Sequence, residues 1–158
     1  MPGARSRRLV LAGAILAALL TAGLSAAGEA PRAVVVRDPT GHVVAREALP
    51  PKGDFGLAYR HSYYRAPARE LFRAGRAGFA LRALASPSAA VLDYYALRGQ
   101  RTRGGGWVRL ELSQRPHYRH LSLIATTTGR RTLVVGDRSV PLYRAGARHL
   151  TLTVEGGS

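Results

Sequence analysis

The sequence predicts an all-β fold, in the form of a single small β-sandwich or barrel-like domain that follows an N-terminal signal or anchor segment. After Ala27, no stretch of about 11 residues has the periodicity of a helix. Short runs rich in β-branched and aromatic residues instead recur every eight to fifteen residues, separated by Gly, Pro and Asp. The 131 residues that remain after the first 27 (158 − 27) have the usual size of one domain.

The expected strands follow one another along the chain. Residues 33–38 and 42–49 flank Asp38-Pro39-Thr40-Gly41, in which Pro suits the second turn position and Gly the fourth, so they predict a β-hairpin. Further strands are expected at 54–63, 68–74, 79–85, 107–113, 120–126, 131–136, 139–145 and 149–155. Roughly nine or ten strands are compatible with either a sandwich or a barrel.

Two segments interrupt this pattern. Residues 86–99 have the composition of either a short helix or a strand. Residues 100–106 combine arginine with the triple glycine Gly104 to Gly106 and are expected to form a flexible loop. Such a loop either grips a ligand or lies free on the surface.

The first 27 residues have the pattern of an export segment. Arg5, Arg7 and Arg8 precede an uncharged run from Leu9 to Ala27. This pattern fits a cleavable signal peptide cut before Gly28, and the length of the run fits an uncleaved membrane anchor equally. Residues 28–158 are then a single β-rich extracytoplasmic domain, either periplasmic or held on the outer side of the inner membrane. The chain has no cysteine, which excludes a disulfide framework and thiolate metal sites.

The charge is strongly positive, with a formal net charge of +15, and 23 of the 24 basic residues are arginine. After Ala27 the balance is 21 basic and 9 acidic residues, or 21 − 9 = +12. This balance favours acidic partners, such as anionic lipid head groups or carboxylate ligands. The arginines are scattered singly along the strands, which disfavours nucleic-acid binding because that usually needs one concentrated basic surface.

The segment YRHSYYRAPARE, from Tyr59 to Glu70, is the main candidate site. In a strand, Tyr59 and His61 share a face with Phe55 and Leu57, whereas Ser62 points to the other side. His61 and Ser62 therefore do not form the nucleophile and base of a hydrolase.

A turn around Arg65 and Ala66 would pair Tyr63 with Ala68, His61 with Glu70, and Tyr59 with Phe72. On this register His61 and Glu70 face each other. Three interpretations remain open for the pair: a structural pair that fixes strand register, a ligand or metal site, or a catalytic pair.

Other candidate residues carry weaker signals. His117 and His120 are three apart, which places them on opposite faces of one extended strand, and no nearby carboxylate completes a metal set. No metal site and no cofactor are expected. Trp107 follows the triple glycine, where it either stacks on a ligand or packs at the start of a strand.

The pattern F-x-L-x-Y-x-H-S-x-x-x-x-P-x-x-E, with Phe55, His61-Ser62, Pro67 and Glu70, resembles the bacterial domain of unknown function 1850 family. The resemblance covers roughly residues 34–155 and makes His61, Ser62, Pro67 and Glu70 its structural motif. It implies an N-terminal membrane segment and a small extracytoplasmic domain. It also implies a neighbourhood with tripartite ATP-independent periplasmic (TRAP) transporters, especially the type with a TAXI solute-binding protein.

Two functions follow as expectations. The first is a non-enzymatic extracytoplasmic accessory protein associated with a TRAP-type (TAXI) transporter, whose partners are transporter subunits or the solute-binding protein. The alternative is a β-domain that binds a small organic anion through the His61/Glu70 hairpin, with Tyr59 and Trp107 beside it. An enzyme is not expected, because the sequence has no close carboxylate pair, zinc signature, phosphate-binding glycine loop or nucleophile and base pair.

Overall fold

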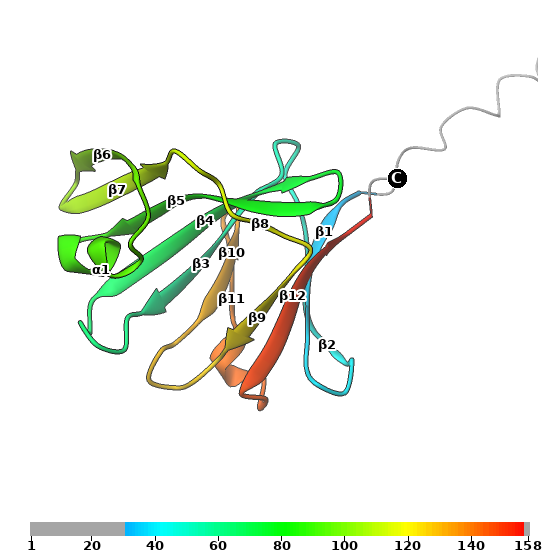
Figure 1. Ribbon diagram of the computed structural model, residues 1–158. Helices are drawn as coiled ribbons and strands as arrows, with labels where there is room; N and C mark the ends of the chain where they lie inside the picture. Colours follow the sequence, from blue (N-terminus) through cyan, green and yellow to red (C-terminus); the bar gives the residue numbers. More distant parts are fainter. Residues whose placement is uncertain (1–30, 157–158) are drawn as a thin grey trace, which may run out of the picture.

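The computed structural model describes residues 31–156, which form an open β-sandwich of two antiparallel sheets (Figure 1). The all-β prediction is therefore confirmed, and the structure is a sandwich rather than a barrel. The strands are β1 (Ala33–Arg37), β2 (Val43–Ala48), β3 (Asp54–Arg60), β4 (Pro67–Gly75), β5 (Gly78–Ser86), β6 (Gly99–Gly104), β7 (Trp107–Leu112), β8 (His117–Tyr118), β9 (His120–Ile124), β10 (Thr132–Val135), β11 (Arg138–Pro141) and β12 (His149–Glu155). A short helix, α1 (Ala89–Tyr94), and a 3-10 helix, η1 (Leu142–Arg144), complete the described fold.

The two sheets differ in size. The smaller has the order β2-β1-β12-β9, and the larger has the order β11-β10-β3-β4-β5-β7-β6, with β8 also paired to β5. The chain passes from one sheet to the other at Arg119, because β8 pairs with β5 and β9 pairs with β12. His117 and His120 therefore lie in two sheets, and the prediction that they share one strand is wrong.

The hydrophobic core lies between the sheets. Val34 and Val36 of β1 face the larger sheet, whose Phe55, Phe72 and Phe79 form an aromatic group. The rings of Phe55 and Phe72 are stacked with centroids 5.2 Å apart, and Phe79 meets Phe55 edge-on at 5.4 Å. Alternating large apolar residues from both inner faces thus fill the sandwich, as the period of a strand requires.

An ion pair joins the sheets at one edge of the sandwich. Arg138 Nε of β11 lies 2.7 Å from Glu47 Oε2 of β2, and the Glu47 side chain is mostly buried. Because β2 and β11 are edge strands of different sheets, this contact holds two edges together that no backbone ladder joins.

The first predicted hairpin is confirmed. The amide of Gly41 donates to the carbonyl of Asp38 at 3.0 Å, which closes the turn between β1 and β2. Asp38 Oδ1 accepts from the amides of Thr40 at 2.9 Å and His42 at 3.1 Å. Gly41 has a φ of 87°, a conformation that glycine adopts without a steric penalty.

Three expectations about secondary structure need correction. Residues 100–104, expected within a loop, belong to the edge strand β6 (Gly99–Gly104), whose residues are all exposed. The predicted strand at 139–145 ends at Pro141 and continues as η1. Twelve strands are present among residues 31–156 instead of nine or ten. The ambiguous segment 86–99 contains α1, so its helical alternative is the correct one.

The described chain begins and ends at the same end of the sandwich. β1 and β12 are antiparallel neighbours, and Ala33 pairs with Glu155 (right-hand side of Figure 1). Within residues 31–156, no helix is long and apolar enough to span a membrane. The predicted signal or anchor, residues 1–27, lies outside the described residues.

Candidate functional site

The candidate residues from the sequence lie in three different places. Tyr59 and Glu70 meet on the inner face of the larger sheet, at the end that α1 covers. His61 lies beyond the end of β3, beneath tyrosine side chains. Trp107 lies on the outer face of the same sheet, where the guanidinium of Arg69 covers its ring at 4.7 Å. The structure therefore does not assemble these four residues into one site.

The predicted register of the β3–β4 hairpin is wrong by four residues. Tyr59 pairs with Ala68 and Leu57 pairs with Glu70, so His61 and Glu70 do not face each other. β3 ends at Arg60, which lies opposite Pro67, and the amide of His61 donates to the carbonyl of Ala66 at 2.8 Å.

The cause of this shift is the position of the turn along the chain. Four residues, 62–65, make the reversal in place of the expected two-residue turn, and Arg65 takes a positive φ of 55°. The centre of the turn therefore moves from Arg65 and Ala66 to Tyr63 and Tyr64. A shift of four residues leaves the side-chain faces unchanged, so Tyr59 keeps the predicted inward direction.

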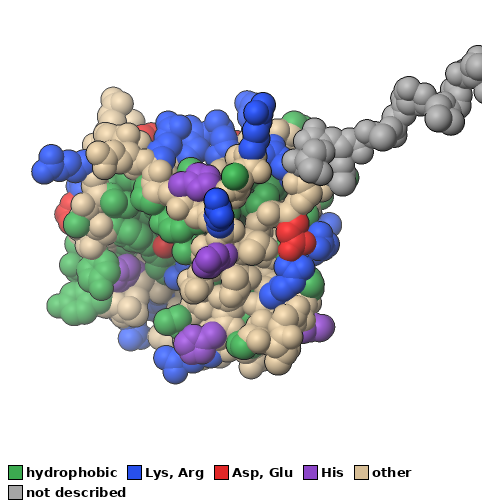
Figure 2. All heavy atoms as spheres, turned by 45° about the vertical axis from the view of Figure 1, so that its right-hand side comes forward, with side chains coloured by type: hydrophobic (Ala, Val, Ile, Leu, Met, Phe, Trp, Pro, Cys, Tyr) green, Lys and Arg blue, Asp and Glu red, His purple; other side chains and the backbone are tan. Residues whose placement is uncertain are grey.

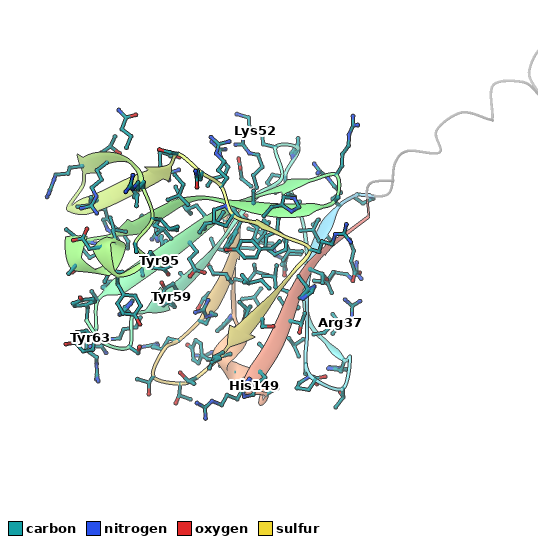
Figure 3. The ribbon with its side chains drawn as sticks, viewed as in Figure 1. Arg37, Lys52, Tyr59, Tyr63, Tyr95 and His149 are labelled. Atoms are coloured by element: carbon teal, nitrogen blue, oxygen red, sulfur yellow. The ribbon has the colours of Figure 1, made fainter. Side chains whose placement is uncertain are left out.

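Tyr59, Glu70, Tyr95 and Arg131 form a group of polar side chains that we call the polar cap. The Tyr95 hydroxyl donates to Glu70 Oε1 at 2.7 Å and is hydrogen-bonded to the Tyr59 hydroxyl. The other carboxylate oxygen accepts from Arg131 Nη1 at 3.4 Å, and the Arg131 guanidinium lies 4.7 Å from the centre of the Tyr59 ring. Figure 3 shows Tyr59 and Tyr95 next to each other. The polar cap closes one end of the apolar core, and each member has a polar partner.

Burial shifts the acidity of both tyrosines in the polar cap. Burial raises the pKa of Tyr59 to about 12, and the negative charge of Glu70 adds to that effect. The same two causes, in the same order, raise the pKa of Tyr95 further. Both hydroxyls therefore keep their protons at neutral pH, which allows Tyr95 to donate to the carboxylate.

We expect the polar cap to lose stabilising energy at alkaline pH. An unfolded tyrosine has a pKa near 10, whereas folded Tyr59 has a pKa of about 12, so its contribution is complete below pH 10 and is lost as the pH rises through 12. In urea titrations at pH 8 to 12, the free energy of unfolding should fall by about 1 kcal/mol more in the wild type than in Tyr59→Phe, after allowance for partial solvent screening. An equal dependence of the free energy of unfolding on pH in the wild type and in Tyr59→Phe would contradict this account of the polar cap.

The second group, which we call the tyrosine tip, consists of His61, Tyr63, Tyr64 and Tyr94. Tyr63 is 76% exposed and Tyr94 is 65% exposed, whereas His61 beneath them is only 6% exposed. The His61 ring lies 4.8 Å from that of Tyr94 and 5.3 Å from that of Tyr64, and its Nδ1 accepts from the Tyr64 amide at 3.3 Å. Figure 3 places Tyr63 at the end of the domain away from the start of β1 and the end of β12.

The end of helix α1 and the residue that follows it supply one side chain to each group. Val91 and Leu92 are buried and fix the helix against the larger sheet. The two adjacent residues at its end then diverge, with Tyr94 packed on His61 and Tyr95 bonded to Glu70. Sequence reasoning missed both tyrosines as site residues, because they lie 25 to 36 residues from their partners and the helix that positions them was ambiguous.

The outer face of the larger sheet is hollowed beside Trp107. Arg69, Arg103 and Trp107 line a depression of about 380 Å³. It adjoins a larger one of about 600 Å³, and both include Arg69, Leu71 and Arg109. The alternation of arginine with apolar residues along β4 is the sequence signal for this face, but the neighbouring strands could not be identified without the topology.

Apolar and basic side chains are distributed differently over the visible surface. In Figure 2, apolar side chains gather on the side where Figure 1 shows α1, whereas Lys and Arg side chains are spread over the visible face. Residues 31–156 contain no group of three or more His, Asp or Glu side chains placed to hold a metal ion.

Comparison with protein-family models, with curated proteins and with solved structures finds no match for the chain.

Proposed function

We propose that the protein is a non-enzymatic extracytoplasmic accessory protein whose tyrosine tip docks an acidic protein partner, most simply a component of a TRAP-type (TAXI) transporter. One observation carries the proposal: Tyr63, Tyr64 and Tyr94 are exposed together at one end of the domain. Aromatic side chains that cluster on a surface are typical of protein interfaces, where they bury a large area at a small cost in conformational entropy.

The contacts of the tip suggest that it is held in shape before a partner arrives. The Tyr63 and Tyr64 rings meet edge-on at 5.0 Å, and His61 supports Tyr64 and Tyr94 from below. A rigid aromatic surface loses little entropy on binding, which favours affinity.

The charge around the tip favours an acidic partner. Arg60 at the end of β3 and Arg65 in the following loop are both exposed, and Arg60 Nε donates to the carbonyl of Arg65 at 2.9 Å. The nearest acidic residue on α1, Asp93, is already paired with Arg101. A partner surface that combines carboxylates with apolar groups would therefore complement this end of the domain.

The identity of the partner rests on the motif of residues 55–70 and its resemblance to the domain of unknown function 1850 family. The extracytoplasmic location rests on the export pattern of residues 1–27. The position of the tip is consistent with both, because a chain that enters the domain at Pro31 enters at the end opposite Tyr63. A domain tethered at that end can present its tip to another extracytoplasmic protein.

The structure does not support the alternative function, a small-molecule site formed by His61 and Glu70 in the β3–β4 hairpin. His61 and Glu70 do not meet: His61 packs against Tyr94 of α1, and Glu70 accepts from Tyr95. A separate candidate for an organic-anion site is the arginine-lined depression on the outer face of the larger sheet.

A co-purification experiment tests the docking proposal. The full chain, tagged at its C-terminus, is recovered from native membranes after gentle crosslinking, and the associated proteins are identified by mass spectrometry. We expect a transporter subunit or solute-binding protein with the wild type, and at least a tenfold lower recovery with the double variant Tyr63→Ser, Tyr94→Ser.

The matched control is Ile124→Ser, which removes an exposed apolar side chain from the smaller sheet; Ile124 is 54% exposed. This variant should recover the partner as the wild type does. Recovery of the wild-type protein without a transporter subunit or solute-binding protein would refute the docking proposal. Equal recovery of the partner with the wild type and with the tyrosine double variant would also refute it.

A further inference from the structure

A second, separate binding surface lies on the outer face of the larger sheet. Its main depression has a volume of about 600 Å³, within the range of small-molecule sites, and it continues into the smaller one beside Trp107. Gly56 and Ala58 of β3 form part of its lining and alternate with the core residues Phe55 and Leu57. The small side chains leave space on this face, and longer arginines surround it.

Four arginines line the main depression, Arg69, Arg73, Arg82 and Arg109. Two carboxylates contact them: Asp54 pairs with Arg73 at 2.7 Å and with Arg82 Nη1 at 3.8 Å, and Glu111 pairs with Arg109 at 2.6 Å. The local balance is therefore 4 − 2 = +2. A small dianion would neutralise this surplus.

Two of these arginines have hydrogen-bonding capacity that the described residues do not use. Arg82 Nε is buried and has no hydrogen-bond partner among residues 31–156. Arg69 forms no ion pair with a carboxylate of the described residues, and its guanidinium lies over the ring of Trp107. A buried donor without an acceptor is costly, and an anionic ligand that supplies acceptors would remove that cost.

The sheet register sets the spacing of the charges. Arg69 and Arg109 both pair with Ala85, one from each side, so their backbones are two strand spacings apart, or about 10 Å. Arg69 and Arg73 are four residues apart on one face of β4, or about 13 Å. Because the positive groups are spread over such distances, a ligand with two separate anionic groups fits them better than a single phosphate.

We propose that this depression binds a small organic dicarboxylate. One carboxylate lies between Arg69 and Arg109, above the methyl group of Ala85. The other lies near Arg82 and Arg73, where Arg82 Nε gains an acceptor. Arginine suits this task because its planar guanidinium pairs with a carboxylate through two parallel hydrogen bonds. The inference is independent of the docking function proposed for the tyrosine tip.

Isothermal titration calorimetry of the full chain at low ionic strength tests the site. Succinate and glutarate serve as dicarboxylate probes, with butyrate and inorganic phosphate as controls. We expect a Kd below about 1 mM for at least one dicarboxylate, and binding at least tenfold weaker for both controls. Absence of dicarboxylate binding, or equal binding of phosphate or butyrate, would overturn the proposal.

Arg69→Gln is the informative variant, because Arg69 is exposed and we expect its replacement to leave the fold intact. It should weaken dicarboxylate binding at least tenfold. Arg76→Gln, in the exposed turn after β4, is the matched control and should bind as the wild type does. If Arg69→Gln and Arg76→Gln bind the dicarboxylate with equal affinity, the ligand does not bind in this depression. The Tyr63→Ser, Tyr94→Ser protein should keep wild-type affinity, so failure of this site and failure of the docking surface can be told apart.

Discussion

Replacement of Phe79 by alanine is expected to lower the free energy of unfolding by about 3–5 kcal/mol. Phe79 is completely buried, and its ring lies 5.4 Å from Phe55, 5.6 Å from Phe72 and 5.7 Å from Tyr118. Truncation removes these contacts and leaves a cavity between neighbours from three strands that cannot close it without moving the sheet. Urea denaturation followed by circular dichroism measures the loss.

The control for Phe79 is Ile124→Ala, at a position that is 54% exposed on β9. It removes an apolar side chain of comparable character from the surface and should cost less than about 1 kcal/mol. Similar losses for the two variants would mean that the aromatic group is not the centre of the core.

The second large effect is expected for Glu70→Ala, which should cost about 3–5 kcal/mol. The Glu70 side chain is only 14% exposed, and its loss leaves the Arg131 guanidinium and the Tyr95 hydroxyl without their acceptor. Glu70→Gln keeps an oxygen that can accept from Tyr95, so a smaller cost of about 1–2 kcal/mol is expected. Thermal and urea unfolding of the three proteins compare these values.

Glu111→Ala provides the surface comparison for Glu70. Arg109 Nε lies 2.6 Å from Glu111 Oε1, but both side chains are substantially exposed. The ion pair should therefore contribute no more than about 1 kcal/mol to the free energy of unfolding. A cost for Glu70→Ala as small as that of Glu111→Ala would show that the polar cap is solvated and does not support the core.

The sequence was sufficient for local features of the fold. Alternation along residues 54–60 correctly placed Phe55, Leu57 and Tyr59 on the inner face. The Asp38 to Gly41 turn was predictable because Pro, Asp and Gly each have a positional preference in a four-residue reversal. Edge strand β6 was missed because it has no apolar residue to produce an alternating pattern, and only its pairing with β7 defines it.

The candidate site was less predictable, because its contacts join distant parts of the chain. Tyr59 and Glu70 were correctly expected on one face, but they meet through Tyr95 and Arg131, which come from α1 and from the segment before β10. The loop of the β3–β4 hairpin decided the remaining difference. Because the turn is centred on Tyr63 and Tyr64 and not on Arg65 and Ala66, His61 does not face Glu70 and instead supports exposed tyrosines.

The position of the β3–β4 turn also determines that Tyr63 is exposed for docking. A turn centred on Arg65 and Ala66 would have kept Tyr63 within the strand opposite Ala68, whereas the observed turn has Tyr63 at its centre and exposes it. Apolar rings that are fixed in an exposed position stay available to a partner. The docking proposal depends on this arrangement and not on any chemistry of His61 or Ser62.

Site-specific photo-crosslinking tests that proposal most directly. A photoreactive amino acid is placed at Tyr63 in one protein and at Ile124 in another, and each is irradiated in native membranes. We predict a crosslink to an acidic extracytoplasmic protein from position 63 and none to that protein from position 124. Crosslinks to the same protein from both positions, or none from position 63, would contradict the assignment of the tyrosine tip as a docking surface.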